Sequence, residues 1–130
     1  MSIKDLVNIL PIELILKVVE HKPDSVDWKY ISQNISKLPE KFIEEYNDYI
    51  YWEYISENQP LSEEFIERHA DDVDWDEISI HQELSEDFIE KYADRVNWKY
   101  ISEFQMLSES FIEKYKDRVD WYIITKRVIY

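Results

Sequence analysis

The stretch LSEDFIEKYADRVNWKYIS, residues 84–102, is one copy of a unit that recurs along the chain. Gap-free copies are LSEEFIERHADDVDWDEIS at 61–79 and LSESFIEKYKDRVDWYIIT at 107–125, and LPEKFIEEYNDYIYWEYIS at 38–56 follows the same template. The end of a further copy, DSVDWKYIS, lies at 24–32. Tryptophan therefore recurs at 28, 52, 75, 98 and 121, with spacings of 24, 23, 23 and 23 residues. Repetition at such a period is typical of proteins built from stacked repeats.

Each copy predicts two short helices. In the copy at 84–102, Ser85 is a suitable N-cap for the first helix. Apolar residues then follow every four residues, which places them on one helical face: Leu84, Phe88, Tyr92 and Val96. Asn97 is positioned to cap a second helix that opens with Trp98, and the corresponding caps in other copies are Asp27, Asp74 and Asp120.

A helix pair of this size cannot bury its apolar side alone, so neighbouring pairs must stack. The predicted fold class is all-α, an α-solenoid of tandem short helix-turn-helix repeats with modified capping ends. We expect a single repeat domain over 1–130. Its predicted parts are an N-terminal capping helix at 1–23, a partial repeat at 24–37, full repeats at 38–60, 61–83, 84–106 and 107–125, and a C-terminal cap at 126–130. The phenylalanines and tryptophans should each form a buried ladder.

Composition excludes several classes of function. The 29 acidic and 15 basic residues give a formal net charge of −14, which disfavours direct binding to nucleic acid. Glycine is absent, and phosphate-binding loops and nucleophile elbows depend on it. Cysteine is absent as well, so thiolate metal sites are excluded. No segment has the pattern of a signal peptide or membrane span, so we expect an intracellular protein with no membrane partner.

The unit LSExFIExYxDxVDWxxIS resembles a short helical repeat, about 23 residues long, that is common in large DNA viruses infecting amoebae. The resemblance covers about residues 24–125, and it implies an α-solenoid and a viral origin without implying a reaction. Location in the host cytoplasm, the nucleus or the virion follows from it as an expectation. The chain departs from the repeat pattern at Pro39, Tyr51 and His69.

A second resemblance covers about ten residues near the N-terminus. The stretch LPIELILKVV at 10–19 looks like the opening of an F-box, which often reads LPxELxxKI. This resemblance implies an adaptor that tethers a repeat domain to a ubiquitin ligase. The alternative interpretation is a capping helix with Pro11 near its start.

No residue cluster predicts catalysis, a metal site or a cofactor. His69 stands where other copies carry Tyr46, Tyr92 and Tyr115, which indicates packing rather than metal binding. Ser56, Ser79 and Ser102 recur without a matching histidine base, so backbone hydrogen bonding explains them better. A second recurring set is expected to bind the loops between repeats: Gln59, Gln82 and Gln105.

Acidic residues recur once per repeat as a candidate ladder: Glu44, Glu67, Glu90 and Glu113. Such a ladder suits a solvated surface, and its alternative role is to hold a basic segment of a partner. Asp48, Asp71, Asp94 and Asp117 form a similar set that turn chemistry explains.

The sequence therefore predicts a non-enzymatic module for protein–protein interaction. Specificity should reside in second-helix positions that differ between copies: Glu53, Tyr54, Asp76, Glu77, Lys99, Tyr100 and Tyr122. Two alternatives are an F-box-like adaptor and a structural or virion component. The latter would self-associate as a homo-oligomer through its apolar C-terminal helix.

Overall fold

The computed structural model describes residues 12–129, and this part of the chain contains helices and turns but no strand. It confirms the predicted all-α solenoid of repeated helix pairs. The chain divides into two compact units, Met1–Gln59 and Pro60–Tyr130, and each is described by itself. The division falls beside the predicted boundary between the repeats at 38–60 and 61–83.

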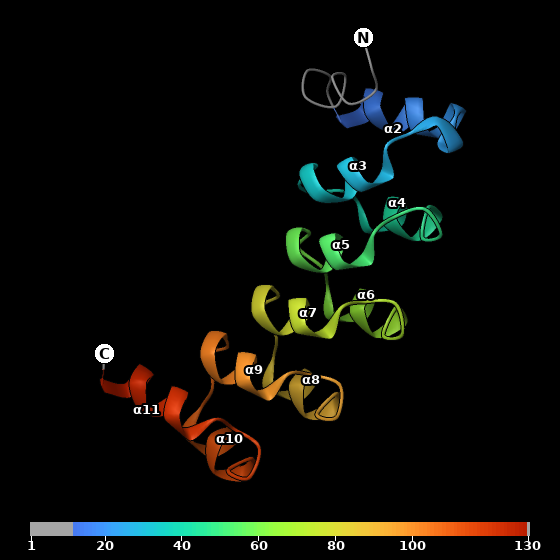
Figure 1. Ribbon diagram of the computed structural model, residues 1–130. Coiled ribbons are helices and arrows are strands. Elements are labelled where there is room, and N and C mark those ends of the chain that lie inside the picture. Colours follow the sequence, from blue (N-terminus) through green and yellow to red (C-terminus); the bar gives the residue numbers. More distant parts are fainter. Residues whose placement is uncertain (1–11, 130) are drawn as a thin grey trace. The chain divides into compact units, whose positions relative to one another are not determined.

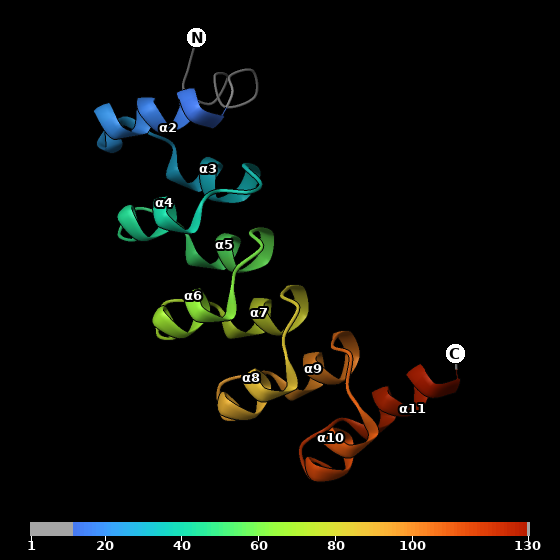
Figure 2. The same cartoon turned by 180° about the vertical axis from the view of Figure 1, so that it is seen from behind.

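Unit 1 contains two helix pairs. Its elements are α2 (Ile12–His21), a 3₁₀ turn η1 (Pro23–Ser25), α3 (Trp28–Asn34), α4 (Glu40–Glu45) and α5 (Trp52–Asn58). Helices α3 and α5 pack side by side, and α2 and α4 lie on the other side of the same unit (Figures 1 and 2).

Unit 2 contains three helix pairs. Its helices are α6 (Glu63–Arg68), α7 (Trp75–His81), α8 (Glu86–Lys91), α9 (Trp98–Phe104), α10 (Glu109–Lys114) and α11 (Trp121–Ile129). The second helices α7, α9 and α11 form one row and pack on each other in order, while α6, α8 and α10 form the opposite row (Figure 1).

The predicted caps are present at both kinds of helix. The side chain of Ser85 accepts a hydrogen bond from the backbone N–H of Phe88, and Ser62 and Ser108 do the same in their repeats. Asp27, Asp74 and Asn97 cap the second helices. Pro39 and Tyr51, which depart from the repeat pattern, make no side-chain cap.

The turn between the helices of a pair is closed without glycine. In the pair α8–α9, the N–H groups of Arg95 and Val96 both donate to the carbonyl oxygen of Tyr92. Tyr92 itself has φ −108° and ψ 31°, which an ordinary L-residue adopts without strain. The first helix therefore ends in a tight turn that any side chain tolerates, and this explains how the chain repeats without glycine.

Phenylalanine forms the predicted buried set, since Phe42 in unit 1 and Phe65, Phe88 and Phe111 in unit 2 are all buried. The prediction of buried tryptophans is only partly correct. Trp28 is buried, but Trp75 and Trp98 are half-buried and Trp121 is 49% exposed. One face of the Trp75 indole packs on the rings of Phe88 and Tyr92 in the next repeat, with centroids 6.2 and 5.1 Å apart. The guanidinium of Arg95 lies 5.6 Å from the same ring, so its remaining surface meets a cation instead of the core.

The spacing of 24 residues between Trp28 and Trp52 has a local structural cause. Ile35 takes the place of the junction glutamine, and one additional residue precedes Leu38. Lys37 adopts a left-handed conformation with φ 61°, the one positive φ within residues 12–129. The extra residue is therefore absorbed in this loop, and the helices on either side keep the repeat pattern.

The two ends follow the repeat more closely than predicted. Helix α2 occupies the place of a first helix before α3, so the partial repeat and part of the predicted cap together form a helix pair. At the other end, α11 continues past the usual stopping point, as expected. Arg127 donates to the carbonyl oxygens of Ser102 and Gln105 at 2.6 and 2.8 Å. It thereby takes the role that Gln105 has toward the preceding repeat.

Candidate functional site

The seven predicted partner-binding positions are exposed or partly exposed in their own units. Glu53 and Tyr54 lie on α5 in unit 1. In unit 2, Asp76 accepts a hydrogen bond from the side-chain amide of Asn97 at 2.9 Å, and Glu77 lies 3.2 Å from His81. The Tyr100 ring lies 6.4 Å from that of Phe104. Several of these side chains are therefore engaged within the protein.

The structure brings together two of these residues, Lys99 on α9 and Tyr122 on α11. They line an open hollow of about 750 Å³ on the second-helix side of unit 2, together with Glu103, Asp120, Ile123, Lys126 and Arg127. Tyr122 is 72% exposed, and the ammonium of Lys126 lies 5.0 Å from the centre of its ring. The hollow combines an accessible aromatic ring with charges of both signs, a composition found at protein-binding sites.

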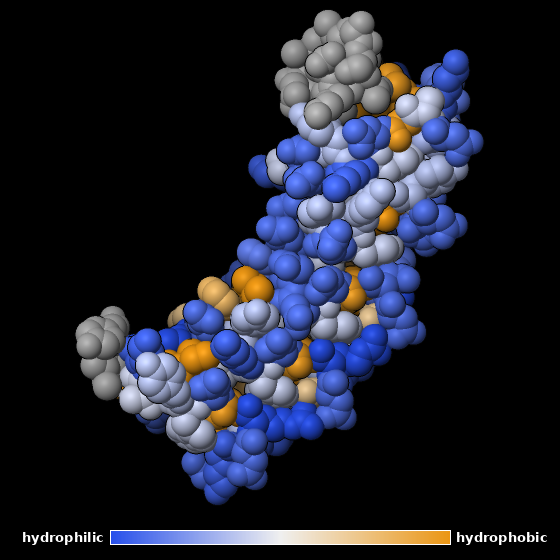
Figure 3. All heavy atoms as spheres, in the orientation of Figure 1, coloured by the Kyte–Doolittle hydropathy of each residue, from blue (hydrophilic) through white to orange (hydrophobic). Residues whose placement is uncertain are grey.

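Cations outnumber anions in this hollow, although the chain as a whole is acidic. Lys99, Lys126 and Arg127 face only two carboxylates, those of Glu103 and Asp120. Hydrophilic residues dominate the visible surface, with hydrophobic residues in separate patches (Figure 3). The hollow is thus distinguished by its local charge, not by a broad apolar area.

The acidic ladder is largely paired within the protein. Lys91 on α8 bonds to the carboxylate of Glu67 on α6, and Lys114 on α10 bonds to that of Glu90 on α8. Glu113 lies 3.7 Å from Lys116. In both of these pairs, the lysine belongs to the repeat that follows the glutamate. The ladder therefore joins first helices, which leaves less free charge for a basic partner.

These pairings change the ionisation of the groups involved. The hydrogen bond from Lys91 lowers the pKa of Glu67, and the hydrogen bond from Lys114 lowers the pKa of Glu90. The two lysine pKa values are raised by the same bonds. Burial is the main cause that raises the pKa values of Tyr92 and Tyr115, with the adjacent glutamates adding to it. All of these shifts favour the charged pair and a neutral tyrosine at neutral pH.

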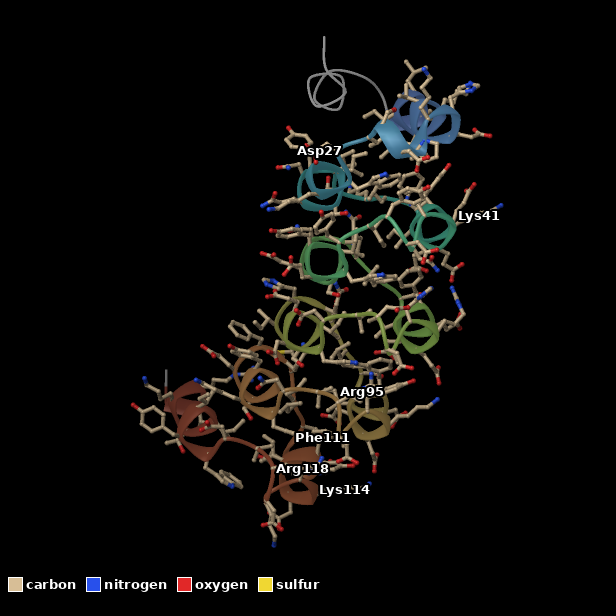
Figure 4. The ribbon with its side chains drawn as sticks, turned by 45° about the vertical axis from the view of Figure 1, so that its right-hand side comes forward. Asp27, Lys41, Arg95, Phe111, Lys114 and Arg118 are labelled. Carbon is tan, nitrogen blue, oxygen red and sulfur yellow. The ribbon has the colours of Figure 1, made fainter. Side chains whose placement is uncertain are left out.

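Arginine makes a second connection between repeats. The Arg95 guanidinium bonds to the Asp71 carboxylate at 3.0 Å and also to the Ala70 carbonyl oxygen. Arg118 bonds in the same way to Asp94, at 2.7 Å, and to Ala93. Both arginines are labelled in Figure 4, where Phe111 points inward from α10 and Lys114 marks its exposed side. Turn chemistry was predicted to explain the aspartates; the missed signal was an Arg that stands 24 residues after Asp71 and another 24 residues after Asp94.

The recurring serine and glutamine residues hold the repeats together. Ser79 and Ser102 are fully buried, and each hydroxyl donates to the carbonyl oxygen of the tryptophan that opens its own helix. Gln105 accepts from the N–H of Leu84 and donates to the carbonyl oxygens of Ser79 and Gln82. These bonds confirm that the serines bond to backbone and that the glutamines bind the loops between repeats.

The histidines have separate surroundings. His69 is buried, lies 4.5 Å from the Phe65 ring and is 3.3 Å from the Asp72 carboxylate, which confirms its packing role. His81 is exposed beside Glu77 on its own helix.

Both alternative sites lie partly outside the described residues. Leu10 and Pro11 of the F-box-like stretch lie there, while Ile15 and Val19 of α2 are buried in unit 1. Tyr130 of the predicted self-association surface also lies outside them. Val128 is 81% exposed at the end of α11.

Within residues 12–129, no helix is both long and apolar enough to cross a membrane. Comparison with protein-family models, with curated proteins and with solved structures found no match to this sequence.

Proposed function

We propose that this chain is a non-enzymatic protein-interaction module that binds a partner in the hollow between α9 and α11. The observation that carries the proposal is that Lys99 and Tyr122, two positions that vary between repeats, line this hollow of about 750 Å³. Repeat proteins bind partners through residues that vary on a conserved scaffold. By contrast, the recurring serines and glutamines of the second-helix side and the recurring phenylalanines are buried in the scaffold: Ser79, Ser102, Gln82, Gln105, Phe65, Phe88 and Phe111.

The chemistry of the hollow favours a segment that carries a carboxylate beside an apolar side chain. Lys99, Lys126 and Arg127 attract a carboxylate, and the exposed Tyr122 ring offers area for an apolar group. The chain as a whole carries a net charge of −14, which repels an acidic partner from the rest of the surface. A carboxylate-bearing segment would therefore bind selectively at this hollow. The resemblance of the repeat to those of large DNA viruses supports a host protein as this partner.

Site-specific photocrosslinking tests the proposal. p-Benzoylphenylalanine at position 122 keeps an aromatic side chain in the hollow, and the same group at Asp87, exposed on the first-helix side, is the matched control. We expect one protein to be crosslinked from position 122 and not from position 87, and the crosslink to be lost in Lys99→Glu. Identical products from both positions would contradict the proposal.

A second candidate function is self-association through the C-terminal end of unit 2. Ile66 and Ile89 are fully buried, but Ile112 at the equivalent position is only half-buried. It lines a hollow of about 210 Å³ with Leu107, Ile124, Arg127 and Val128. Exposed apolar groups in one place favour association.

Sedimentation equilibrium distinguishes this second candidate. Val128→Asp should lower the average mass of the particle, whereas Ser110→Asp, which adds the same charge at an exposed site on α10, should leave it unchanged. A mass that is monomeric in the unmodified protein, or identical in Val128→Asp, would eliminate self-association through α11.

A further inference from the structure

Two junctions in unit 2 share a cluster of three side chains. In one, Lys91 bonds to Glu67 and its ammonium lies 5.9 Å from the centre of the Tyr92 ring. In the next, Lys114 bonds to Glu90 and lies 5.8 Å from the Tyr115 ring. A carboxylate and an aromatic ring thus provide the same seat for an ammonium group in both junctions.

Unit 1 has the corresponding seat without the lysine. The hydroxyl of Tyr49 bonds to Asp24 at 2.8 Å, 25 residues away, where Arg95 bonds to Asp71 over 24 residues. With this one-residue offset, the position of Glu67 corresponds to Glu20 and that of Lys91 corresponds to Glu45.

Ring contacts confirm this register. The Trp28 ring lies 6.1 Å from Phe42 and 5.2 Å from Tyr46, which match the distances of 6.2 and 5.1 Å from Trp75 to Phe88 and Tyr92. Tyr46 therefore corresponds to Tyr92, and two carboxylates stand where the other junctions hold one carboxylate and one ammonium group.

A hollow opens at this place in unit 1. It has a volume of about 310 Å³ and is lined by Leu16, Glu20, Pro39, Lys41, Phe42, Glu45 and Tyr46. In unit 2, the Glu63 carboxylate closes the same region by accepting from the N–H and hydroxyl of Ser85, at 2.6 and 2.9 Å. Leu16 and Pro39 replace these two residues and cannot form the bonds, so the region keeps an open, apolar wall.

We infer that this hollow between α2 and α4 binds a lysine side chain of a partner protein. The ammonium would lie between Glu20 and Glu45 over the Tyr46 ring, and the methylene stem would pack on Leu16 and Pro39. Lysine is the occupant because lysine fills both sister seats in unit 2. An incoming ammonium also relieves the repulsion between the two carboxylates.

Two further observations support this assignment. The pKa of Tyr46 is raised, mainly by burial and then by the charges of Glu45 and Glu20, so both carboxylates act on the same ring. Within residues 12–129, Glu20 and Glu45 form no ion pair at 4.0 Å or less. Lys41 lies at the rim and extends outward from α4 (Figure 4).

An NMR titration of the full chain tests the inference. The probe is the peptide acetyl-Leu-Lys-Leu-amide, and its matched control carries Nε-acetyl-lysine, which has no charge. We expect saturable shifts at Glu20, Glu45 and the Tyr46 ring, with a dissociation constant on the order of 1 mM because single exposed ion pairs are weak. The acetylated peptide should bind at least about 10-fold more weakly, because it lacks the positive charge that the two carboxylates attract.

Variants identify the seat. Glu45→Lys should fill it and abolish binding, and Glu45→Gln should weaken binding without adding a cation. Glu113→Lys makes the same charge change in the last repeat and should leave the affinity within about twofold, the range expected for a distant surface substitution. In the spectrum of each full-length variant, unchanged resonances of unit 2 show that the protein is folded.

Two outcomes would overturn the inference. Equal shifts at Glu109, Glu113 and Asp117 would show general attraction to an acidic protein. Binding that appears only in Lys41→Ala would show that Lys41 itself occupies the seat.

Discussion

The buried hydroxyl of Ser79 accepts a hydrogen bond from the backbone N–H of Asn97, 18 residues later, at 3.0 Å. The same hydroxyl donates to the carbonyl oxygen of Trp75 at 2.7 Å. One small side chain therefore connects α7 with the residue that caps α9. Ser32 makes the equivalent bond to Tyr51 in unit 1, and Ser102 makes it to Asp120 in unit 2.

Replacing Ser79 by alanine should destabilise the protein. The variant leaves the N–H of Asn97 without its acceptor in a part-buried place, which costs about 1–3 kcal/mol in the free energy of unfolding. Urea denaturation followed by circular dichroism measures the change. Ser110→Ala removes an exposed hydroxyl and should alter stability by less than about 0.5 kcal/mol. Equal effects of the two substitutions would show that the buried bridge contributes nothing.

Gln105 is expected to be more sensitive than Ser79, because its amide group satisfies three backbone groups: Leu84 N–H, Ser79 C=O and Gln82 C=O. Gln105→Met keeps the length of the side chain but removes all three bonds, and should cost about 3 kcal/mol. The midpoint of urea denaturation reports this loss. Gln33→Met, at an exposed position in unit 1, is the control. A loss below that of Ser79→Ala would contradict the proposed order.

Local chemistry made the helices predictable from the sequence. An N-cap such as Ser85 acts on an N–H only three residues later, so its bond to Phe88 depends on nothing outside the repeat. The buried face of each first helix is likewise set by the spacing of its apolar residues. The fold class, the caps and the buried phenylalanines could therefore be predicted.

Contacts between repeats were harder to predict, because they depend on which faces the stack brings together. The pair Glu67–Lys91 joins residues 24 positions apart in two different repeats, so the spacing within one helix does not reveal it. The hollow around Tyr122 depends on where α11 lies against α9, and no periodic pattern contains that information. The Leu16 and Pro39 substitutions become meaningful only beside the bond between Glu63 and Ser85 that they replace.

Lys37 offers a test of backbone strain. Its φ of 61° is unfavourable for a residue with a β-carbon, and glycine adopts it without that cost. Lys37→Gly should therefore raise the free energy of unfolding by about 0.5–1 kcal/mol, measured as an increase in the urea midpoint. Glu83→Gly, in a junction loop where φ is negative, should instead lower stability, because glycine there only adds freedom to the unfolded chain. Destabilisation by both substitutions would show that the loop does not need the left-handed conformation.

The pair Glu67–Lys91 predicts a specific dependence of stability on pH. Lys91 lowers the pKa of Glu67 in the folded protein, so the stabilisation is present above the unfolded value of 4.5 and is lost as the pH falls through the lower folded value. Glu67 raises the pKa of Lys91, so the same stabilisation is present below pH 10.5 and is lost as the pH rises through the higher folded value.

A double-mutant cycle with Glu67→Gln and Lys91→Met isolates this coupling from other effects of each substitution. We expect a favourable coupling free energy at pH 7 that decreases in 1 M salt and declines further as the pH falls below 4.5 through the lower folded pKa of the carboxyl group. The exposed pair Glu113–Lys116, at 3.7 Å, should show a smaller coupling in the same measurements. A coupling between Glu67 and Lys91 that persists unchanged at pH 2 would mean that the two side chains stabilise the repeat by packing, and not through their charges.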